Sequence, residues 1–521
     1  MRRLFITLIS LWVPVLIYSQ ETPALKWLAS EYVKAVNVKG PEIKKDTQGN
    51  IFTISTQVHL NPLVGFILIK YDPEGNKLWE RNYEGFLPHL YFGPAIDPEG
   101  NAYVSINYGG LPGLPTYTIL LKYAPDGELL WEISFEDWSN NVTNLLAAGP
   151  SGLLYFAGGV SNINITQGYY VGCLDTSNGS IIWKTEQTGQ INPYNIKLLD
   201  DKIVLFANGL AVPGSNTRYH VIQQFDYDGE LLATGMTEDT GFYGPDFNEI
   251  TDDGDVLVGN RGFGYTATKI SKEGSILWQY DKPLIFDKAF VRGLTFDDSL
   301  NTYITGGWSQ YQTWIDFVTT KISPTGEILW ENIYFASQDS LVDIGNSIVV
   351  DSLYTYAVGT QGEGGDIGSR ELTILVQDKD SGEILYNLPI GLENRNMAGV
   401  EIILVNSGFV IVGISDSTIS NTTQVHTGYY KFSHPVSISE ETGKTASFVL
   451  YPNPARDVVN IQLSNLTTGG GVAEIFDLNG RSLMIEPLKG RRKLELDIGY
   501  LQAGMYVLRL DSQALKFNVV K

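Results

Sequence analysis

Cysteine is almost absent from this sequence, and histidine is scarce. The single Cys173 rules out a disulfide within the chain, and its apolar surroundings, YYVGCLD, predict a small buried side chain. No two of the five histidines have metal-ligand spacing within one element. GxSxG, HExxH and phosphate-loop motifs are also missing. No cofactor is therefore expected. The histidines are His59, His89, His220, His426 and His434.

Positive charge is in short supply. The chain has 36 Lys and Arg against 58 Asp and Glu, a net charge of −22, and the acidic excess lies in residues 20–447. A surface this acidic repels phosphate backbones and anionic lipid, which excludes nucleic acid and membrane surfaces as expected partners.

Long apolar runs are missing except at the N-terminus, MRRLFITLISLWVPVLIYSQETP. Two arginines, a short apolar stretch and a small residue predict a signal peptide over residues 1–19, with cleavage after Ser19. The alternative, a membrane anchor, needs about 20 apolar residues and is interrupted by Pro14. No transmembrane segment is expected in the mature protein.

The middle of the chain is repetitive. DPEGNKLWERNY (72–83) returns as APDGELLWEISF (124–135), and turn glycines recur at intervals of 45 to 56 residues. In five of the seven units, a tryptophan stands four residues after the turn glycine. This fixed position predicts a structural role for the indole. The glycines are Gly75, Gly127, Gly179, Gly229, Gly274, Gly326 and Gly382, and the residues in that phase are Trp79, Trp131, Trp183, Ala233, Trp278, Trp330 and Tyr386.

A second hairpin precedes each of these turns, as in PAIDPEGNAYVSIN (94–107) and EIILVNSGFVIVGIS (401–415). Two hairpins form a four-stranded sheet, which covers its apolar faces by radial stacking, with the tryptophan in the wedge between neighbours. The upstream hairpins lie near residues 43, 96, 146, 196, 248, 294, 346 and 401.

We therefore expect an all-β fold: an eight-bladed β-propeller over residues 20–432, with seven blades and a stray hairpin as the alternative. The last unit has only GYYKF (428–432) after its hairpin. The segment ALKWLASEY (24–32) is expected to pair with the strand containing Tyr429 and Tyr430, which would close the ring and remove an exposed edge.

CLDTSNGSIIWK (173–184) resembles the repeat of pyrroloquinoline-quinone-like eight-bladed propellers. DPEGNAYVS (97–105) and DDSLNTYITG (297–306) resemble bacterial secreted β-propeller repeats. The resemblance implies the fold more than a function. Quinone-dependent dehydrogenases of that fold hold their cofactor with adjacent cysteines and calcium, and the lone Cys173 departs from that pattern.

After a polar linker (433–447), short strands resume and predict a small β-sandwich over residues 448–521. LYPNPARDVVNIQL, IFDLNGR, LQAGMYVLRL and KFNVVK occur in that order and resemble the type A sorting domain of the type IX secretion system. The resemblance implies export through the periplasm to the cell surface or medium, with the outer-membrane machinery as a partner. The matching motif residues are Pro452, Asn453, Pro454, Gly504, Tyr506, Lys516 and Lys521.

Two sets of residues are candidates for ligands. The acidic turns FDYDGE (Asp226, Asp228) and TDDGD (Asp252, Asp253, Asp255) offer oxygen atoms, but they lack a complete calcium loop, and hairpin turns favour the same residues. In the expected propeller, other loops emerge on the side opposite to these tight turns. They carry an aromatic and acidic rim suited to binding carbohydrate or protein. Its members are Trp138, Tyr243, Asp246, Trp308, Tyr311, Trp314 and Asp316. Each aromatic among them has a loop anchor as its alternative role.

The leading hypothesis is thus an exported, non-catalytic binding or scaffold propeller whose ligand, a glycan or a protein, the sequence does not name. The alternative is a secreted polysaccharide lyase or hydrolase with paired carboxylates in the propeller channel.

Overall fold

A computed structural model provides the structure of the chain, which divides into two units, residues 25–431 and residues 1–24 together with 432–521. The structure describes residues 23–33, 41–58, 64–85, 89–108, 117–134, 141–162, 165–210, 217–238, 247–259, 264–283, 289–309, 315–334, 342–362, 370–392, 394–405, 408–417, 423–431, 448–451, 455–456, 458–463, 472–476, 482–487, 493–499, 501–502, 504–510 and 513–519.

All regular structure in these ranges is β-strand, as the sequence predicts, and the strands of residues 24–431 form eight antiparallel sheets of four. Seven sheets use consecutive strands. They are β2 (Glu42–Lys45), β3 (Ile51–Val58), β4 (Val64–Tyr71) and β5 (Lys77–Gly85); β6 (His89–Ile96), β7 (Ala102–Tyr108), β8 (Tyr117–Tyr123) and β9 (Leu129–Ser134); β10 (Asn141–Ala148), β11 (Leu153–Asn162), β12 (Ile165–Asp175) and β13 (Ile181–Thr188); β14 (Gln190–Leu198), β15 (Ile203–Leu210), β16 (Tyr219–Phe225) and β17 (Leu231–Glu238); β18 (Phe247–Ile250), β19 (Val256–Gly259), β20 (Tyr265–Ile270) and β21 (Ile276–Lys282); β22 (Ala289–Phe296), β23 (Thr302–Trp308), β24 (Asp316–Ile322) and β25 (Ile328–Tyr334); and β26 (Ile344–Val350), β27 (Tyr354–Gly362), β28 (Arg370–Asp378) and β29 (Ile384–Ile390).

The remaining sheet joins the two ends of this unit. Its strands are β30 (Arg395–Val405), β31 (Gly408–Ser417), β32 (Thr423–Lys431) and β1 (Ala24–Val33), and β1 is hydrogen-bonded to β32. The ring of Trp27 on β1 lies 6.3 Å from that of Tyr429. Strand β1 therefore pairs with a strand about 400 residues away.

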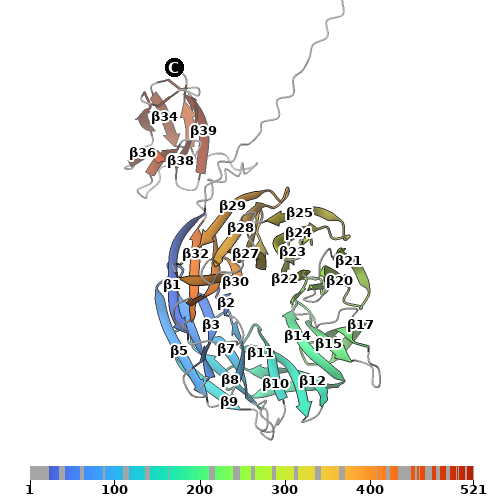
Figure 1. Cartoon of the computed structure of the whole chain (residues 1–521). Helices are drawn as coiled ribbons and strands as arrows, with labels where there is room; N and C mark the ends of the chain where they lie inside the picture. Colours follow the sequence, from blue (N-terminus) through green and yellow to red (C-terminus); the bar gives the residue numbers. More distant parts are fainter. Residues whose placement is uncertain are drawn as a thin grey trace, which may run out of the picture. The chain divides into compact units, whose positions relative to one another are not determined.

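The sheets lie around a central opening, with first strands such as β14, β22 and β30 nearest to it (Figure 1). This is the arrangement of a β-propeller. Each first strand contacts the next, in the order β2, β6, β10, β14, β18, β22, β26 and β30, and β30 also contacts β2.

The unit has two faces with different connections. We call the side with the short turns within each hairpin, such as 97–101 and 124–128, the turn face. The side with the connections from second to third strands and from sheet to sheet, such as 309–315 and 335–343, is the loop face.

On the turn face, tryptophans fasten each sheet to its neighbour. Trp79 on β5 donates its indole N–H to the carbonyl oxygen of Pro125 in the next sheet, at 2.8 Å. Gly127 in the same turn has φ +85°, and a Cβ there would lie 2.7 Å from the Trp79 ring. The periodic tryptophan and the periodic glycine thus contact each other. Only glycine fits at the turn position, because it has no Cβ and adopts positive φ without strain.

The same indole-to-carbonyl bond recurs from sheet to sheet, which confirms the predicted structural role of the repeated tryptophan. Two of the other acceptor carbonyls also accept a hydrogen bond from the ammonium group of a buried lysine. Lys122 donates to Thr176 and Lys321 donates to Lys379, each at 2.9 Å. The recurring bonds are Trp27 to Pro73 (3.3 Å), Trp131 to Thr176 (2.9 Å), Trp183 to Tyr227 (2.9 Å) and Trp330 to Lys379 (3.0 Å).

The sheet β18–β21 lacks this bond on both sides. Ala233 stands in the tryptophan position of the preceding sheet, and a Cβ on Gly274 would meet the Met236 backbone nitrogen at 2.2 Å, so the turn packs directly on β17. On the other side, the buried Trp278 indole N–H has no partner among the described residues.

The acidic turns work as hairpin turns. One carboxylate oxygen of Asp226 accepts the backbone N–H groups of Asp228 (3.0 Å) and Glu230 (2.7 Å). In the next acidic turn, Asp255 forms an ion pair with Lys269 at 3.3 Å. These contacts confirm the prediction that both sequences are turns.

The terminal unit contains two sheets with a shared core, as expected for a small sandwich. One sheet has the order β33 (Phe448–Tyr451), β34 (Val458–Leu463) and β37 (Lys493–Asp497). The other has the order β36 (Ser482–Pro487), β35 (Val472–Phe476), β38 (Gly504–Leu510) and β39 (Gln513–Val519). Buried residues of both sheets pack together, including Val459, Leu496, Ile475 and Leu508.

The expectation of a small buried side chain at Cys173 is met. Cys173 on β12 is buried and free, and burial raises the pKa of its thiol to about 11, which keeps it protonated and unreactive. Within the described ranges, no helix has the length and apolarity to cross a bilayer.

Candidate functional site

The described residues form one polar cluster at the loop-face ends of β24 to β28, which we call the Asp316 cluster. Asp316 is the first residue of β24, and Asp343 directly precedes β26. Tyr334 ends β25, and Gln361 lies near the end of β27. Strand ends from two neighbouring sheets thus bring these side chains to one place.

The backbone holds Asp316 and Asp343 close together. A parallel bridge joins Ile315 to Val342, and the backbone N–H of Asp343 donates to the carbonyl oxygen of Ile315 at 2.8 Å. The exposed fractions are 6% for Asp316 and 1% for Asp343. Burial, and then the Asp343 charge, raises the pKa of Asp316 to about 6.

The partners of the two carboxylates differ. Asp343 accepts the backbone N–H of Gly362 at 3.1 Å. Asp316 makes no hydrogen bond or ion pair with any residue in the described ranges. One buried carboxylate of the pair is therefore left without a donor.

Tyr334 borders the pair. Its hydroxyl donates to the side-chain oxygen of Gln361 at 3.0 Å and accepts from Asn387. Burial, and then the charge of Asp343, raises the pKa of this phenol to about 12, so it stays protonated at neutral pH. Gln361 in turn donates to Glu371 at 3.0 Å. The hydroxyl is thus oriented by its neighbours.

Trp308, which the sequence places on the rim, is packed inside. It pairs with Asp316 across β23 and β24, and its exposed fraction is 6%. Its indole N–H donates to the carbonyl oxygen of Pro283 at 3.2 Å, and the Lys282 ammonium lies 4.4 Å from the ring centre. Trp308 therefore occupies the anchor position named above as the alternative.

The other predicted rim residues lie outside the described residues. They are Trp138, Tyr243, Asp246, Tyr311 and Trp314. Of the predicted ligand residues, the structure therefore brings together Trp308 and Asp316. Asp343, Tyr334 and Gln361 were not predicted. The only sequence signal for Asp343 is its place directly before an apolar first strand.

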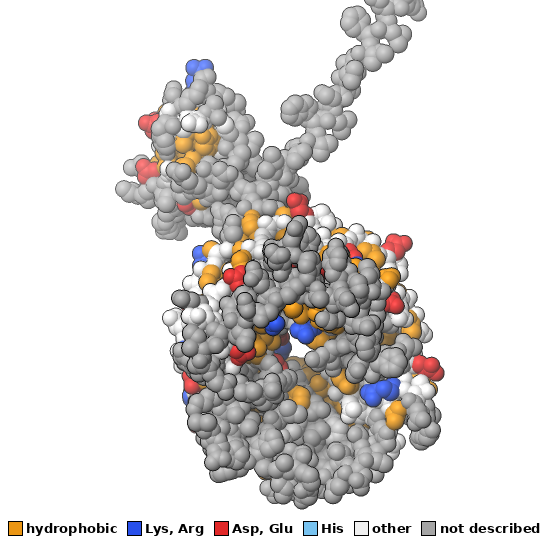
Figure 2. All heavy atoms as spheres, in the orientation of Figure 1, with side chains coloured by type: hydrophobic (Ala, Val, Ile, Leu, Met, Phe, Trp, Pro, Cys, Tyr) orange, Lys and Arg blue, Asp and Glu red, His pale blue; other side chains and the backbone are white. Residues whose placement is uncertain are grey.

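The strands around the central opening carry a polar belt that was not predicted either. Arg292 and Asn346 each occupy a bulge in their strands, β22 and β26. Arg292 donates to the side-chain oxygen of Asn346 at 2.9 Å, and Asn346 donates to the carbonyl oxygen of Gly399 at 2.7 Å. Figure 2 shows Lys and Arg side chains beside the opening.

Three carboxylates belong to the described first strands: Glu42, Glu249 and Glu401. Glu401 on β30 accepts the backbone N–H of Ile43 on β2 at 2.9 Å and lies 3.5 Å from the Lys44 ammonium, which links β30 to β2. Burial raises the pKa of Glu401. On β18, burial raises the pKa of Glu249 to about 7.

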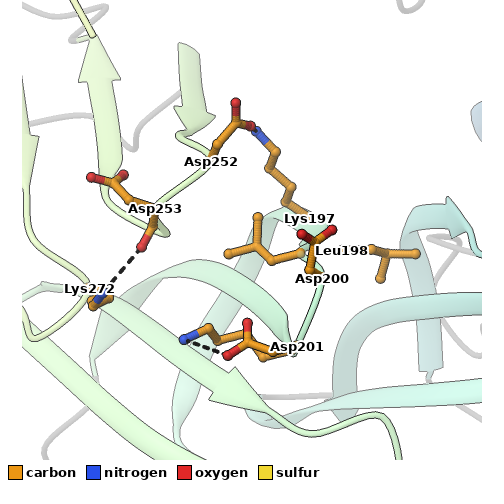
Figure 3. Close-up of a pocket in the computed structure, with 9 residues that line it drawn as sticks. Lys197, Leu198, Asp200, Asp201, Asp252, Asp253 and Lys272 are labelled. Carbon is orange, nitrogen blue, oxygen red and sulfur yellow. Dashed lines mark hydrogen bonds and ion pairs between the residues drawn. The ribbon is translucent and has the colours of Figure 1, made fainter. Parts of the chain in front are cut away.

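A cavity of about 550 Å³ opens on the turn face between β14–β15 and β18–β19 (Figure 3). Lys197 and Lys202 line one side, and Asp252, Asp253 and Lys272 line the other. Lys197 and Asp252 pair across it at 2.7 Å. The cavity lies at the junction where Ala233 replaces tryptophan, away from the predicted rim.

The described residues contain no group of three or more His, Cys, Asp and Glu placed to hold a metal. What the Asp316 cluster offers instead is a pair of buried carboxylates beside a phenol. Such a set can accept hydrogen bonds, hold a cation or share a proton.

The sorting residues can be followed in part. Tyr506 on β38 is buried, and its hydroxyl donates to the carbonyl oxygen of Gln502 at 2.9 Å. Gly504 begins β38, and Lys516 lies on β39. Pro452, Asn453, Pro454 and Lys521 lie outside the described residues.

Residues 449–520 match the secretion system C-terminal sorting domain family. This match covers all the predicted sorting residues except Lys521. It establishes that the protein is exported through the type IX secretion system to the cell surface or medium, and that the terminal unit interacts with the secretion machinery.

No curated protein matches the chain. Solved structures resemble it at low identity. The β-propeller domain of the Trilobed protease from Pyrococcus furiosus is 12% identical, covers 79% of this chain and 100% of its own, and has a TM-score of 0.34. The WD40 domain of SCAP from fission yeast is 11% identical, with coverages of 77% and 98% and a TM-score of 0.41.

PorZ, a surface component of the type IX secretion system of Porphyromonas gingivalis, is 11% identical. The alignment covers 92% of this chain and 91% of PorZ, with a TM-score of 0.23.

Proposed function

We propose that this protein is an exported, non-catalytic binding propeller with eight blades, closed by its N-terminal strand, that holds an extracellular glycan or protein on its loop face. Residues 1–19 act as the signal peptide, and residues 448–521 direct passage across the outer membrane. No cofactor takes part.

Ring closure is supported from two directions. The eight four-stranded sheets of the described residues include one that combines β1 with β30–β32. The contact of β30 with β2, with Glu401 accepting the Ile43 N–H, joins the last first strand to the earliest one. Eight blades account for every described strand in residues 24–431 without a stray hairpin.

The observation that carries the binding role is the difference between the two sets of connections. Turn-face connections such as 72–76 and 124–128 have five residues and repeat the same backbone hydrogen bonds. Loop-face connections such as 59–63, 109–116 and 335–343 differ in length and sequence. Variable connections on a rigid repeated scaffold are where binding residues are usually found.

The proposed ligand contacts belong to these connections in the sequence, except Asp316, which is the first residue of β24. Trp308 is left out of these contacts, because it is buried and its indole N–H donates to the carbonyl oxygen of Pro283. The contacts are Trp138, Tyr243, Asp246, Tyr311, Trp314 and Asp316.

A panel of extracellular polysaccharides and proteins, read for both binding and product release, tests the role. We expect saturable binding that Trp314→Ala weakens and the turn-face variant Glu74→Gln leaves unchanged. Release of shortened sugars would replace the binding function by the enzyme alternative. Equal loss of binding in the two variants would contradict the proposal that the ligand binds at the loop face.

Export is tested by a chain ending at residue 432, in a host with type IX secretion. We expect folded propeller in the periplasm and none outside. As the matched control, residues 433–521 fused to an unrelated periplasmic protein should carry it to the surface or medium. Normal secretion of the truncated chain would contradict the role of residues 448–521.

A further inference from the structure

The junction between the sheets β14–β17 and β18–β21 departs from the repeat on the turn face. At a regular junction, Lys122 on the third strand and Trp131 on the fourth both donate to one carbonyl oxygen of the next sheet at 2.9 Å. The same paired positions here hold Gln224 and Ala233. Gln224 donates to the carbonyl oxygen of Lys272 in the next sheet at 3.5 Å. The contact is therefore longer at this junction, where the cavity of about 550 Å³ opens.

Two lysines line this cavity with donors to spare. The ammonium of Lys202 donates to the side-chain oxygen of Gln224 at 3.3 Å and lies 3.5 Å from Asp201. The ammonium of Lys272 donates to the backbone oxygen of Asp253 at 3.4 Å. Charge-assisted hydrogen bonds are usually shorter, about 2.7–2.9 Å. Within the described ranges neither ammonium has a further partner, so both can donate to an anionic group.

Carboxylates line the same cavity. Asp200 lies in the turn between β14 and β15, and its side chain makes no hydrogen bond or ion pair within the described ranges. The neighbouring Asp201 has Lys202, at 3.5 Å, as its ion-pair partner. Figure 3 shows Asp200 and Asp201 on one side of the cavity and Lys272 on the other. The cavity thus offers acceptors as well as donors.

This lining fits a molecule that carries both charges. An anion would be repelled by the aspartates and a cation by the lysines, whereas a dipolar molecule can bind both. Lys197 and Asp252 pair with each other at 2.7 Å and add no net charge. Leu198 and Leu199 are half-buried and give the lining an apolar part.

We propose that this cavity binds a small zwitterion of the amino-acid class, a free α-amino acid or a short peptide with both ends free. Its carboxylate binds the ammonium groups of Lys202 and Lys272, and its ammonium binds Asp200 and Asp201. An aliphatic side chain packs on the two leucines. The volume falls in the range of small-molecule sites, roughly 300–1,000 Å³. The site lies on the turn face and is separate from the loop-face binding role.

Calorimetric titration of the full chain with leucine and, separately, with leucyl-leucine tests this site. Each ligand is added to about 10 mM, above a dissociation constant of about 1 mM. We expect saturable heat with one site per chain for at least one of them. Saturation by leucine identifies a free amino acid as sufficient, and saturation by leucyl-leucine alone identifies a peptide. N-acetyl-leucine amide, which lacks both charges, should give no saturable heat.

Two variants test the two poles of the site. Lys272→Gln and Asp200→Asn should each weaken binding about tenfold or more, because each removes a charged partner of the ligand. Their side chains make few contacts within the fold, so Tm should remain that of the wild type. Asp298→Asn, at an exposed turn-face position outside the cavity, is the matched control and should bind normally.

Absence of saturable heat with both leucine and leucyl-leucine would overturn the proposal. Equal binding of N-acetyl-leucine amide, or unchanged binding in either variant, would overturn it as well. If a variant does not fold, the comparison of the charged and uncharged ligands on the wild type decides. None of these titrations involves extracellular polysaccharides or proteins, so the proposed loop-face function is tested separately.

Discussion

The turn face and the loop face of the propeller are built from the same strands, yet they treat polar groups differently. On the turn face, Asp97 and Asp297 each receive several donors, and indoles bond to the carbonyl of the next sheet. On the loop face, Asp316 is buried without a donor among the described residues. The difference teaches that the described carboxylates of the turn face have their donors within the fold, whereas Asp316 at the loop face has none among the described residues.

Removing β1 should cause the largest loss of stability, because both faces depend on the closed ring of sheets. Deleting residues 21–33 removes Trp27 and its bond to Pro73 and exposes the edge of β32. We expect Tm to fall by about 10 °C or more, with aggregation through the exposed edge. An unchanged melting curve in calorimetry would refute closure by the N-terminal strand.

The next effect concerns the indole contact of the turn face. Trp79→Ala removes a buried indole that bonds to Pro125 and packs edge-on against Phe52, at 5.8 Å between ring centres. We expect a loss of about 3–5 kcal/mol in the free energy of unfolding by denaturant titration.

The reverse change is the matched control. Ala233→Trp adds an indole at the junction where Gly274 already touches the backbone of Met236. No space is left for the ring between the two sheets, so we expect no gain in stability. A gain in the free energy of unfolding as large as the loss in Trp79→Ala would show that this junction between sheets accepts an indole as the others do.

A pH-dependent effect is expected at the β1 contact. The Arg395 guanidinium donates to the Ser415 hydroxyl at 2.7 Å, and the hydroxyl groups of Ser415 and of Ser30 on β1 are hydrogen-bonded to Nε2 and Nδ1 of His426 at 2.7 and 2.8 Å. Burial, and then the charge of Arg395, lowers the pKa of His426 to about 4.

The unfolded chain binds this proton below its ordinary pKa of about 6.5, whereas the folded chain does not. Stability from His426 is therefore complete above pH 6.5 and is lost as pH falls towards 4, by up to about 3 kcal/mol. His426→Gln should remove this part of the dependence in unfolding measured between pH 4 and 7. Parallel pH profiles for the two proteins would refute the assignment.

The smallest stability effect is expected on the loop face. Tyr334→Phe removes the hydroxyl between Gln361 and Asn387, for a loss of about 1 kcal/mol. Ligand binding to the panel should nevertheless weaken, whereas the turn-face variant Asn76→Ala, which loses a comparable bond to Asp72, should bind normally. Equal ligand binding by the two variants would contradict the assignment of binding to the loop face.

The sequence allowed the propeller's local units to be predicted because the rules involved are short in range. A turn such as 124–128 needs glycine at positive φ, and a tryptophan at fixed phase has one place to pack. The strand alternation around these turns followed directly. Blade number and closure depend on β1 meeting β32, a pairing that the sequence predicted because the last unit is one strand short, and β1 is hydrogen-bonded to β32.

The candidate site was less predictable. Asp316 was identified from its neighbourhood in a loop rich in aromatics, but Asp343 and Tyr334 join it only through the packing of two sheets. Trp308 illustrates the opposite error of inference from composition: an aromatic at a strand end can anchor the loop as easily as face a ligand. Its orientation depends on Lys282 and Pro283, which come from the preceding sheet.

One set of thermal unfolding curves, recorded in EDTA at neutral pH, tests the division between the faces most directly. The proteins are the wild type, Gly127→Ala and Asp316→Asn. Gly127→Ala should lower Tm, because φ +85° and the Trp79 ring at 2.7 Å both oppose a Cβ. Asp316→Asn should raise Tm, because it removes an uncompensated buried charge. A fall in Tm for Asp316→Asn comparable to that for Gly127→Ala would contradict the account.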